Sequence, residues 1–172
     1  MRFTLLDRIT SLEPGAKITA VKNLTMAEEY LGDHFPQFPV MPGVLMLEAM
    51  LEAGAWLVRA GEDFDHSMVM LRKANNVKYG QFVQPGQTLH VTAEIVDQDD
   101  DETKIKARGT MLGRLTVAGR LTLVRYNLAD SNPAHAKTDE QVRTHLRKLF
   151  ALLYDPTRPV EKEEVEVEAE QE

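Results

Sequence analysis

One stretch constrains this chain more than any other: a proline-punctuated segment that runs directly into an apolar helix. Three prolines fall within seven residues, and each fixes its own φ and biases the preceding residue toward extended backbone, so residues 34–41 cannot be helical. Pro42 falls where a helix accepts proline, in the first turn. From Val44 to Val58 nearly every residue is apolar, which predicts a helix buried on almost all sides that Gly61 terminates.

Two polar residues in this frame indicate acid–base chemistry. His34 lies on the stiffened loop, and a neutral imidazole is a suitable base near pH 7. Glu48 lies inside the apolar helix, where burial would raise the pKa of its carboxyl and keep it protonated. Gly43, at the helix start, can offer its backbone N–H to a developing negative charge. Each polar residue alone has a structural explanation, but their joint occurrence favours catalysis.

Composition restricts the alternatives. A chain of 172 residues, 43% apolar and 27% charged, is typical of one globular domain. It has no cysteine, which excludes disulfides, thiol nucleophiles and zinc–thiolate sites. Glu48 and Glu52 interrupt the longest apolar run, so no membrane span is expected. Asp7 and Arg8 fall where the apolar part of a signal peptide would lie, and we expect a cytoplasmic protein.

The negative charge is concentrated at the C-terminus. The formal net charge is −7, and residues 158–172 hold seven glutamates against one lysine and one arginine, which leaves −2 for the rest. This balance argues against nucleic acid as a partner. The glutamate-rich tail is predicted to be disordered. No pair of the five histidines has metal-ligand spacing, so we expect no metal.

Periodicity predicts an α+β fold in which an antiparallel sheet wraps around the long helix. Residues 3–24 should form a hairpin around a type II turn at Glu13-Pro14-Gly15, and a capping box at Thr25–Glu28 should start a short helix through Leu31. The other expected strands are 68–73, 76–82, 88–96, 103–112 and 115–126.

Three parts of the chain follow from these patterns. Residues 1–126 form the main domain, and residues 127–157 a polar linker with an appended helix that Thr138–Gln141 caps, packed on the outside of the sheet. Residues 158–172 are the acidic tail. Because the long helix is apolar all round, a second surface should cover what one sheet leaves open.

The string His34-Phe35-Pro36-Gln37-Phe38-Pro39-Val40-Met41-Pro42-Gly43-Val44-Leu45-Met46-Leu47-Glu48 resembles the signature of the β-hydroxyacyl-acyl-carrier-protein dehydratases of the FabZ/FabA type, which have the hotdog fold. Asp7-Arg8-Ile9, Lys22–Thr25 and Pro85-Gly86 resemble further parts of that family. Nothing after about Asn127 does.

The resemblance implies dehydration of a β-hydroxyacyl thioester on acyl carrier protein to the trans-2-enoyl thioester, without a cofactor. It implies a homodimer or a trimer of dimers, in which His34 of one subunit works with Glu48 of its partner and the Gly43 N–H stabilises the thioester oxygen. The acyl chain would occupy a tunnel at the dimer interface. The residues expected at or around this tunnel are Phe35, Met41, Val44 and Glu52.

Glu52 departs from the family, which usually has glutamine there. Two carboxyls one turn apart on a buried helix should titrate as a coupled pair, unless Glu52 turns away to Arg59. Glu52 also favours one alternative, a non-catalytic subunit that binds acyl chains or carrier protein. The other alternative is a hotdog acyl thioesterase.

Carrier proteins are acidic, so the basic residues Arg72, Lys73 and Lys78 are candidates to receive one. Solvated strand ends would explain these three residues equally well. The acidic tail could mimic a carrier protein at that patch, although a passive solubilising tail is the simpler explanation.

Overall fold

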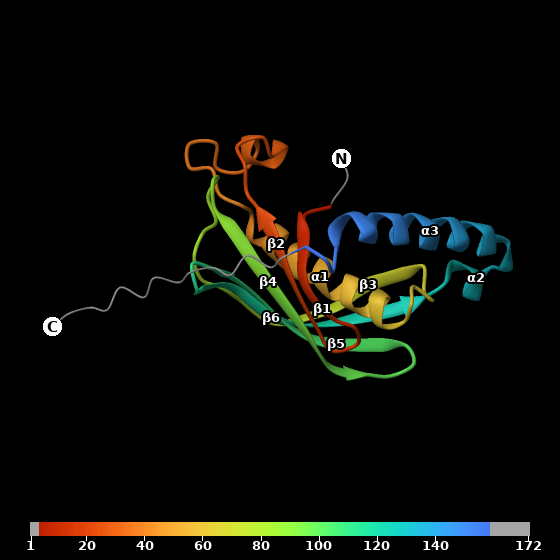
Figure 1. Cartoon of the computed structure of the whole chain (residues 1–172). Helices are drawn as coiled ribbons and strands as arrows, with labels where there is room; N and C mark the ends of the chain where they lie inside the picture. Colours follow the sequence, from red (N-terminus) through yellow and green to blue (C-terminus); the bar gives the residue numbers. More distant parts are fainter. Residues whose placement is uncertain (1–3, 159–172) are drawn as a thin grey trace.

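The computed structural model describes residues 4–158, in which one antiparallel sheet curves around a long helix, α1 (Figure 1). The sheet has six strands in the order β1-β2-β4-β5-β6-β3. The predicted α+β hotdog layout is therefore confirmed. The elements are β1 Arg8–Glu13, β2 Lys17–Asn23, η1 Glu29–Gly32, α1 Gly43–Gly61, β3 Met68–Tyr79, β4 Thr88–Gln98, β5 Glu102–Met111, β6 Arg114–Tyr126, α2 Leu128–Ser131, η2 Pro133–His135 and α3 Ala136–Leu153.

The core lies between α1 and the concave face of the sheet. Strand β5 alternates strictly, so Ile105 and Ala107 are buried toward α1 while Lys106 is exposed on the opposite face. The second half of α1 is buried all round, as its sequence predicts. Its first half is not: Val44 is 69% exposed, and Leu47 is only partly buried. The open half of α1 is the surface that the sequence assigns to a second layer.

The first hairpin forms as predicted. The N–H of Ala16 donates to the carbonyl of Glu13 at 3.0 Å, and Gly15 has a φ of +73°, the conformation that a type II turn needs at its third residue. Gly61, the last residue of α1, touches this turn so closely that a Cβ would lie 2.9 Å from the Gly15 nitrogen. Glycine at the helix end therefore lets the end of α1 reach the hairpin.

The short helix predicted from Thr25 to Leu31 is wrong in its start and its type. A four-residue 3₁₀ turn, η1, begins only at Glu29, and Thr25 closes a preceding turn. The capping box fails because the Glu28 side chain does not reach back to Thr25. It pairs instead with the ammonium of Lys22 at 2.5 Å. A charged partner on β2 thus replaces the local hydrogen bond that the motif predicts.

Two boundaries differ slightly from those predicted. Pro42 is the N-cap of α1 and not part of its first turn, with an extended ψ of 138°. The two runs predicted at residues 68–73 and 76–82 form one strand, β3, which ends at Tyr79. Its pairing with β6 is irregular between Leu71 and Lys73 and again between Asn75 and Lys78. Asn76 has a φ of +51°, a conformation that asparagine tolerates well.

The predicted C-terminal helix is present, and the residues before it contain further helical turns. Residues 127–135 contain the short α2 and η2, and α3 starts at Ala136. The sequence predicts that Asp139 helps to cap α3, but this residue lies inside that helix and is buried. Its carboxylate accepts hydrogen bonds from the N–H groups of Leu128 and Ala129 at 3.0 and 2.9 Å and from the Ser67 hydroxyl at 2.5 Å. It therefore caps α2 and ties α3 to the start of β3.

The apolar stripe of α3 packs beside α1 and not on the outer face of the sheet (Figure 1). The Phe150 ring lies 5.8 Å from Trp56 of α1 and 5.4 Å from Phe64, and Leu153 is buried in the main core. No helix within residues 4–158 is both long and apolar enough to span a membrane. The acidic tail falls outside the described residues from position 159 onward.

Candidate active site at the start of the central helix

His34 lies on the loop between η1 and α1. Its ring is partly buried and tilted against Phe35 at 4.4 Å, and Phe35 takes a left-handed φ of +49° in a tight turn closed by the Phe38 N–H. The loop is fastened at its far end, where the Met41 N–H donates to the Val83 carbonyl at 2.8 Å. The imidazole is thus held by a stiff, proline-containing segment.

Glu48 lies on α1 just over one turn from the helix start. It is half-buried, and this burial raises the pKa of its carboxyl above the usual glutamate value. Within residues 4–158, no hydrogen bond or ion pair occupies this carboxyl, and none joins it to His34. The structure therefore offers a half-buried carboxyl that has a raised pKa and no partner among these residues.

Gly43 is the first residue of α1, and its N–H has no partner inside the helix. A Cβ at this position would lie 3.0 Å from the Tyr79 ring of β3, so the helix start approaches this ring closely. Helix N-termini carry a partial positive charge, which adds to the attraction for a developing oxyanion. The oxyanion role of this N–H stays a prediction.

Glu52, one turn beyond Glu48, turns to the N-terminal segment and makes no ion pair with Arg59. Its Oε2 accepts the N–H groups of Leu5 at 2.8 Å and Leu6 at 3.2 Å. Burial raises the pKa of Glu52, the two backbone hydrogen bonds oppose this rise, and Glu48 adds the smallest contribution. Burial lowers the pKa of Arg59 to about 10, partly offset by Glu52.

The three apolar residues expected around the tunnel differ in position. Phe35 and Val44 are 58% and 69% exposed, whereas Met41 is almost fully buried in the core of the single chain. Further exposed rings surround the same end of α1, and the sequence patterns did not single them out: Phe38 and Phe82 make an edge-to-face contact at 5.8 Å, and Tyr79 lies against Gly43.

The Lys22–Glu28 pair that anchors the segment before His34 was also missed. Its Lys22 side chain is 7% exposed. The sequence signal was the position of this lysine, which lies two residues beyond Ala20 and four beyond Ile18, on the same buried face of β2. No group of three or more His, Asp or Glu side chains in the described part of the chain is arranged to hold a metal ion.

The chain is similar to one family of known proteins over most of its length. The model of the FabA-like domain matches residues 1–121. A 3-hydroxyacyl-(acyl-carrier-protein) dehydratase FabZ of Clostridium kluyveri is 42% identical over 94 residues, 55% of this chain and 65% of that protein, so the chain spans slightly less than two thirds of this relative. The FabZ of Janthinobacterium sp. is 35% identical over 133 residues, 76% of this chain and 85% of that protein.

Among solved structures, the dehydratase heterocomplex ApeI:P from Xenorhabdus doucetiae matches with a TM-score of 0.63 at 17% identity, over 77% of this chain and 90% of that one. This likeness concerns the fold. The family model, the relatives and the His34–Glu48 frame lead to one assignment: the chain belongs to the FabA-like, FabZ-type dehydratase family.

Proposed function

We propose that this protein dehydrates a β-hydroxyacyl thioester carried by acyl carrier protein, giving the trans-2-enoyl thioester and water for fatty acid or related lipid synthesis. The observation that carries the proposal is Glu48, an unoccupied carboxyl whose pKa is raised by burial, one turn from the free N–H of Gly43. Such a carboxyl remains a proton donor closer to neutrality than an exposed glutamate.

Each residue has one role in the reaction. The His34 imidazole removes the proton from the carbon next to the thioester carbonyl, and the electron pair moves toward the carbonyl oxygen. The Gly43 N–H stabilises the negative charge on that oxygen. As the charge returns to form the carbon–carbon double bond, the Glu48 carboxyl gives its proton to the departing hydroxyl, which leaves as water.

The reacting pair comes from two subunits. Within residues 4–158 of one chain, no hydrogen bond or ion pair joins His34 to Glu48, and exposed apolar side chains near the start of α1 offer a surface that a partner would cover. These side chains are Phe35, Phe38, Val44, Tyr79 and Phe82. A homodimer would cover the open half of α1 and form the acyl tunnel there. Assembly into a trimer of dimers and a cytoplasmic location stay predictions.

One incubation tests the activity. Purified protein is mixed with a β-hydroxyacyl thioester, and both enoyl absorbance and free thiol are followed. Dehydration produces enoyl absorbance without thiol, whereas a thioesterase would release thiol. Neither signal would indicate a non-catalytic subunit. Glu52, the residue that favoured this last alternative, now has a structural role, because the backbone of Leu5 and Leu6 uses its carboxyl.

A further inference from the structure

The convex face of the sheet, opposite α1, carries a concentration of positive charge on an otherwise acidic protein. On β5, Lys106 and Arg108 are exposed because the alternate residues are buried against α1. Arg120 of β6 lies directly opposite Lys106 in the strand register. On β3, Lys73 and Lys78 pair with Thr122 and Ala118, so they share this face. We call Lys73, Lys78, Lys106, Arg108 and Arg120 the basic face.

The basic face has too few acids to balance it. Like charges opposite each other across two strands, as in Lys106 and Arg120, destabilise a sheet. Glu94 lies opposite Lys106 but forms an ion pair with Lys17 at 3.0 Å. The pKa of Glu94 is lowered mainly by Lys17 and less by Arg108 and Lys106. Asp97 is likewise taken by Lys104 at 2.8 Å. None of the five basic residues forms an ion pair within residues 4–158.

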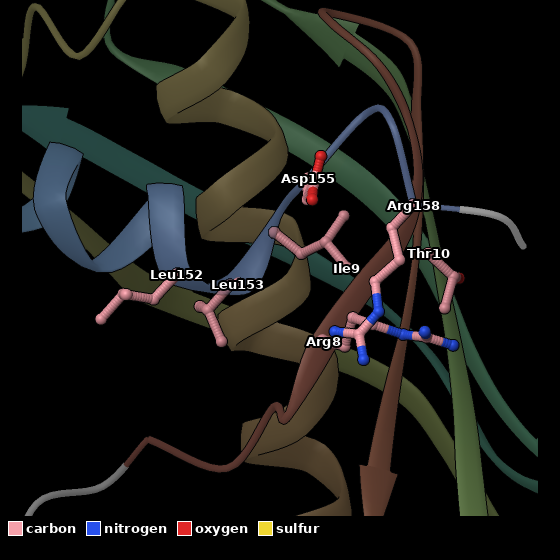
Figure 2. A pocket seen from close by; sticks show the side chains of 7 residues that line it. All are labelled: Arg8, Ile9, Thr10, Leu152, Leu153, Asp155 and Arg158. Atoms are coloured by element: carbon pink, nitrogen blue, oxygen red, sulfur yellow. The ribbon is translucent and has the colours of Figure 1, made fainter.

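The described chain ends at the sheet. Arg158 lines a small pocket together with Arg8 and Thr10 of β1, as Figure 2 shows. Ile9 between them is buried in the core, so Arg8 and Thr10 belong to the convex side of β1. Three strand spacings separate β1 from β5, about 14 Å. The fourteen residues that follow Arg158 can span up to roughly 50 Å when extended, so the basic face is within their reach.

The charge of these residues is complementary to the basic face. Residues 159–172 hold seven glutamates and one lysine, a formal charge of −6. In Glu164-Val165-Glu166-Val167-Glu168-Ala169-Glu170 the acids alternate with apolar residues, so every second residue is a glutamate. Lys106 and Arg108 on β5 are likewise two residues apart in the sequence.

We propose that the acidic segment 159–172 binds the basic face of its own chain. This inference is independent of the catalytic proposal, since it involves neither His34 nor Glu48. The covalent attachment gives the segment a high effective concentration, which compensates for the weakness of individual exposed ion pairs.

Carbodiimide cross-linking of the full chain tests the proposal, because this reagent joins a glutamate directly to a lysine that it touches. At low salt, peptides from 159–172 should be linked to Lys73, Lys78 and Lys106 about fivefold or more above Lys137 and Lys148 of α3. The α3 lysines are matched controls, because both are exposed and Lys148 lies only ten residues before Arg158. These links should fall about tenfold at 1 M salt, where charges are screened beyond about 3 Å.

Two further experiments test whether the segment binds its own chain and whether the basic face is required. In a mixture of heavy and light isotope-labelled protein, links should join segments of equal label, and mixed links would place the segment on a second copy and overturn the proposal. Replacing Lys106 and Arg120 by glutamine should reduce the links at Lys73 and Lys78, whereas K137Q with K148Q should not. Equal linkage to the α3 lysines, or no linkage to the basic face, would also overturn it.

Discussion

The Oε2 atom of Glu52 accepts the N–H of Leu5 at 2.8 Å, across 47 positions of sequence, and so fastens the N-terminal segment to the central helix. Leu5 and Leu6 are both buried, so this carboxyl holds two core residues in place through their backbone. The structure therefore explains why a carboxyl is accommodated one turn from Glu48, where the family usually has an amide.

Replacing Glu52 by glutamine should leave the pH–rate profile nearly unchanged. The structure attributes the raised pKa of Glu48 to burial alone, and Glu48 is the smallest influence on Glu52. Removal of the Glu52 charge should thus hardly move the alkaline limb, where the acid is lost. The free energy of unfolding should decrease by about 1 kcal/mol, because the amide is a weaker acceptor for two N–H groups. A limb displaced to lower pH would instead show that the two carboxyls titrate as a coupled pair.

Replacing Glu48 by glutamine should stabilise the fold at neutral pH. Its pKa is raised in the folded protein, so its contribution to stability is fully present below the unfolded value near 4.5 and is lost as pH rises through the folded pKa. Denaturant unfolding of the variant should show a gain at pH 7 of less than about 1 kcal/mol, since the group is half solvated, and none at acid pH. E13Q, at an exposed turn, is the control. An equal gain at both pH values would contradict this account.

His34→Ala and Glu48→Ala should each lower the dehydration rate by about 10²–10⁴ with an unchanged far-UV spectrum. Near-full activity of either variant would remove that residue from the mechanism. Co-expression of the two variants then tests whether the site is shared between subunits. Random pairing in a symmetric dimer gives half mixed dimers, each with one intact site, so about a quarter of wild-type activity should return. No recovery would place both residues in one chain.

Gly43→Ala should reduce turnover, because the added methyl group would press against the Tyr79 ring. The added Cβ would meet this ring at 3.0 Å, and the half-exposed Tyr79 side chain can yield by a few tenths of an ångström. We expect the fold to survive and kcat to fall about three- to tenfold, because small displacements of an oxyanion donor are costly. Adding Tyr79→Ala should restore most of the rate, with Tyr79→Ala alone as the control. Failure of this rescue would show that the added methyl group acts on something other than the ring.

Asp139→Ala should loosen α3 from the core. Burial alone would raise the pKa of Asp139, but hydrogen bonds from Ser67, Ala129 and Leu128 outweigh it, and the pKa lies below the usual aspartate value. Its stabilising effect is therefore present above the unfolded pKa and is lost as pH falls through the folded one. The variant should melt several degrees lower, with faster amide hydrogen exchange in α3. The exposed neighbour E140Q should change neither, and unchanged exchange in Asp139→Ala would exclude Asp139 as the attachment point.

Most elements of the fold could be predicted from local sequence patterns. The alternation along β4, β5 and β6, the turn at Gly15 and the proline loop before α1 each depend on neighbouring residues only. The elements that were missed depend on distant partners. Glu28 formed no capping box because Lys22 of β2 competed for its carboxylate, and Asp139 caps a helix that ends eight residues before it.

The same division holds for the site. The sequence by itself determined the candidate residues, since His34, Gly43 and Glu48 lie within fifteen positions of one loop–helix junction. It could not reveal that Glu52 holds the backbone of Leu5, that Tyr79 packs on Gly43, or that Lys106 faces Arg120. Sequence periodicity fixes which side of an element a residue takes, because that depends on φ and ψ alone. Which distant residue it then meets is decided only when strand register and helix packing bring the two together in space.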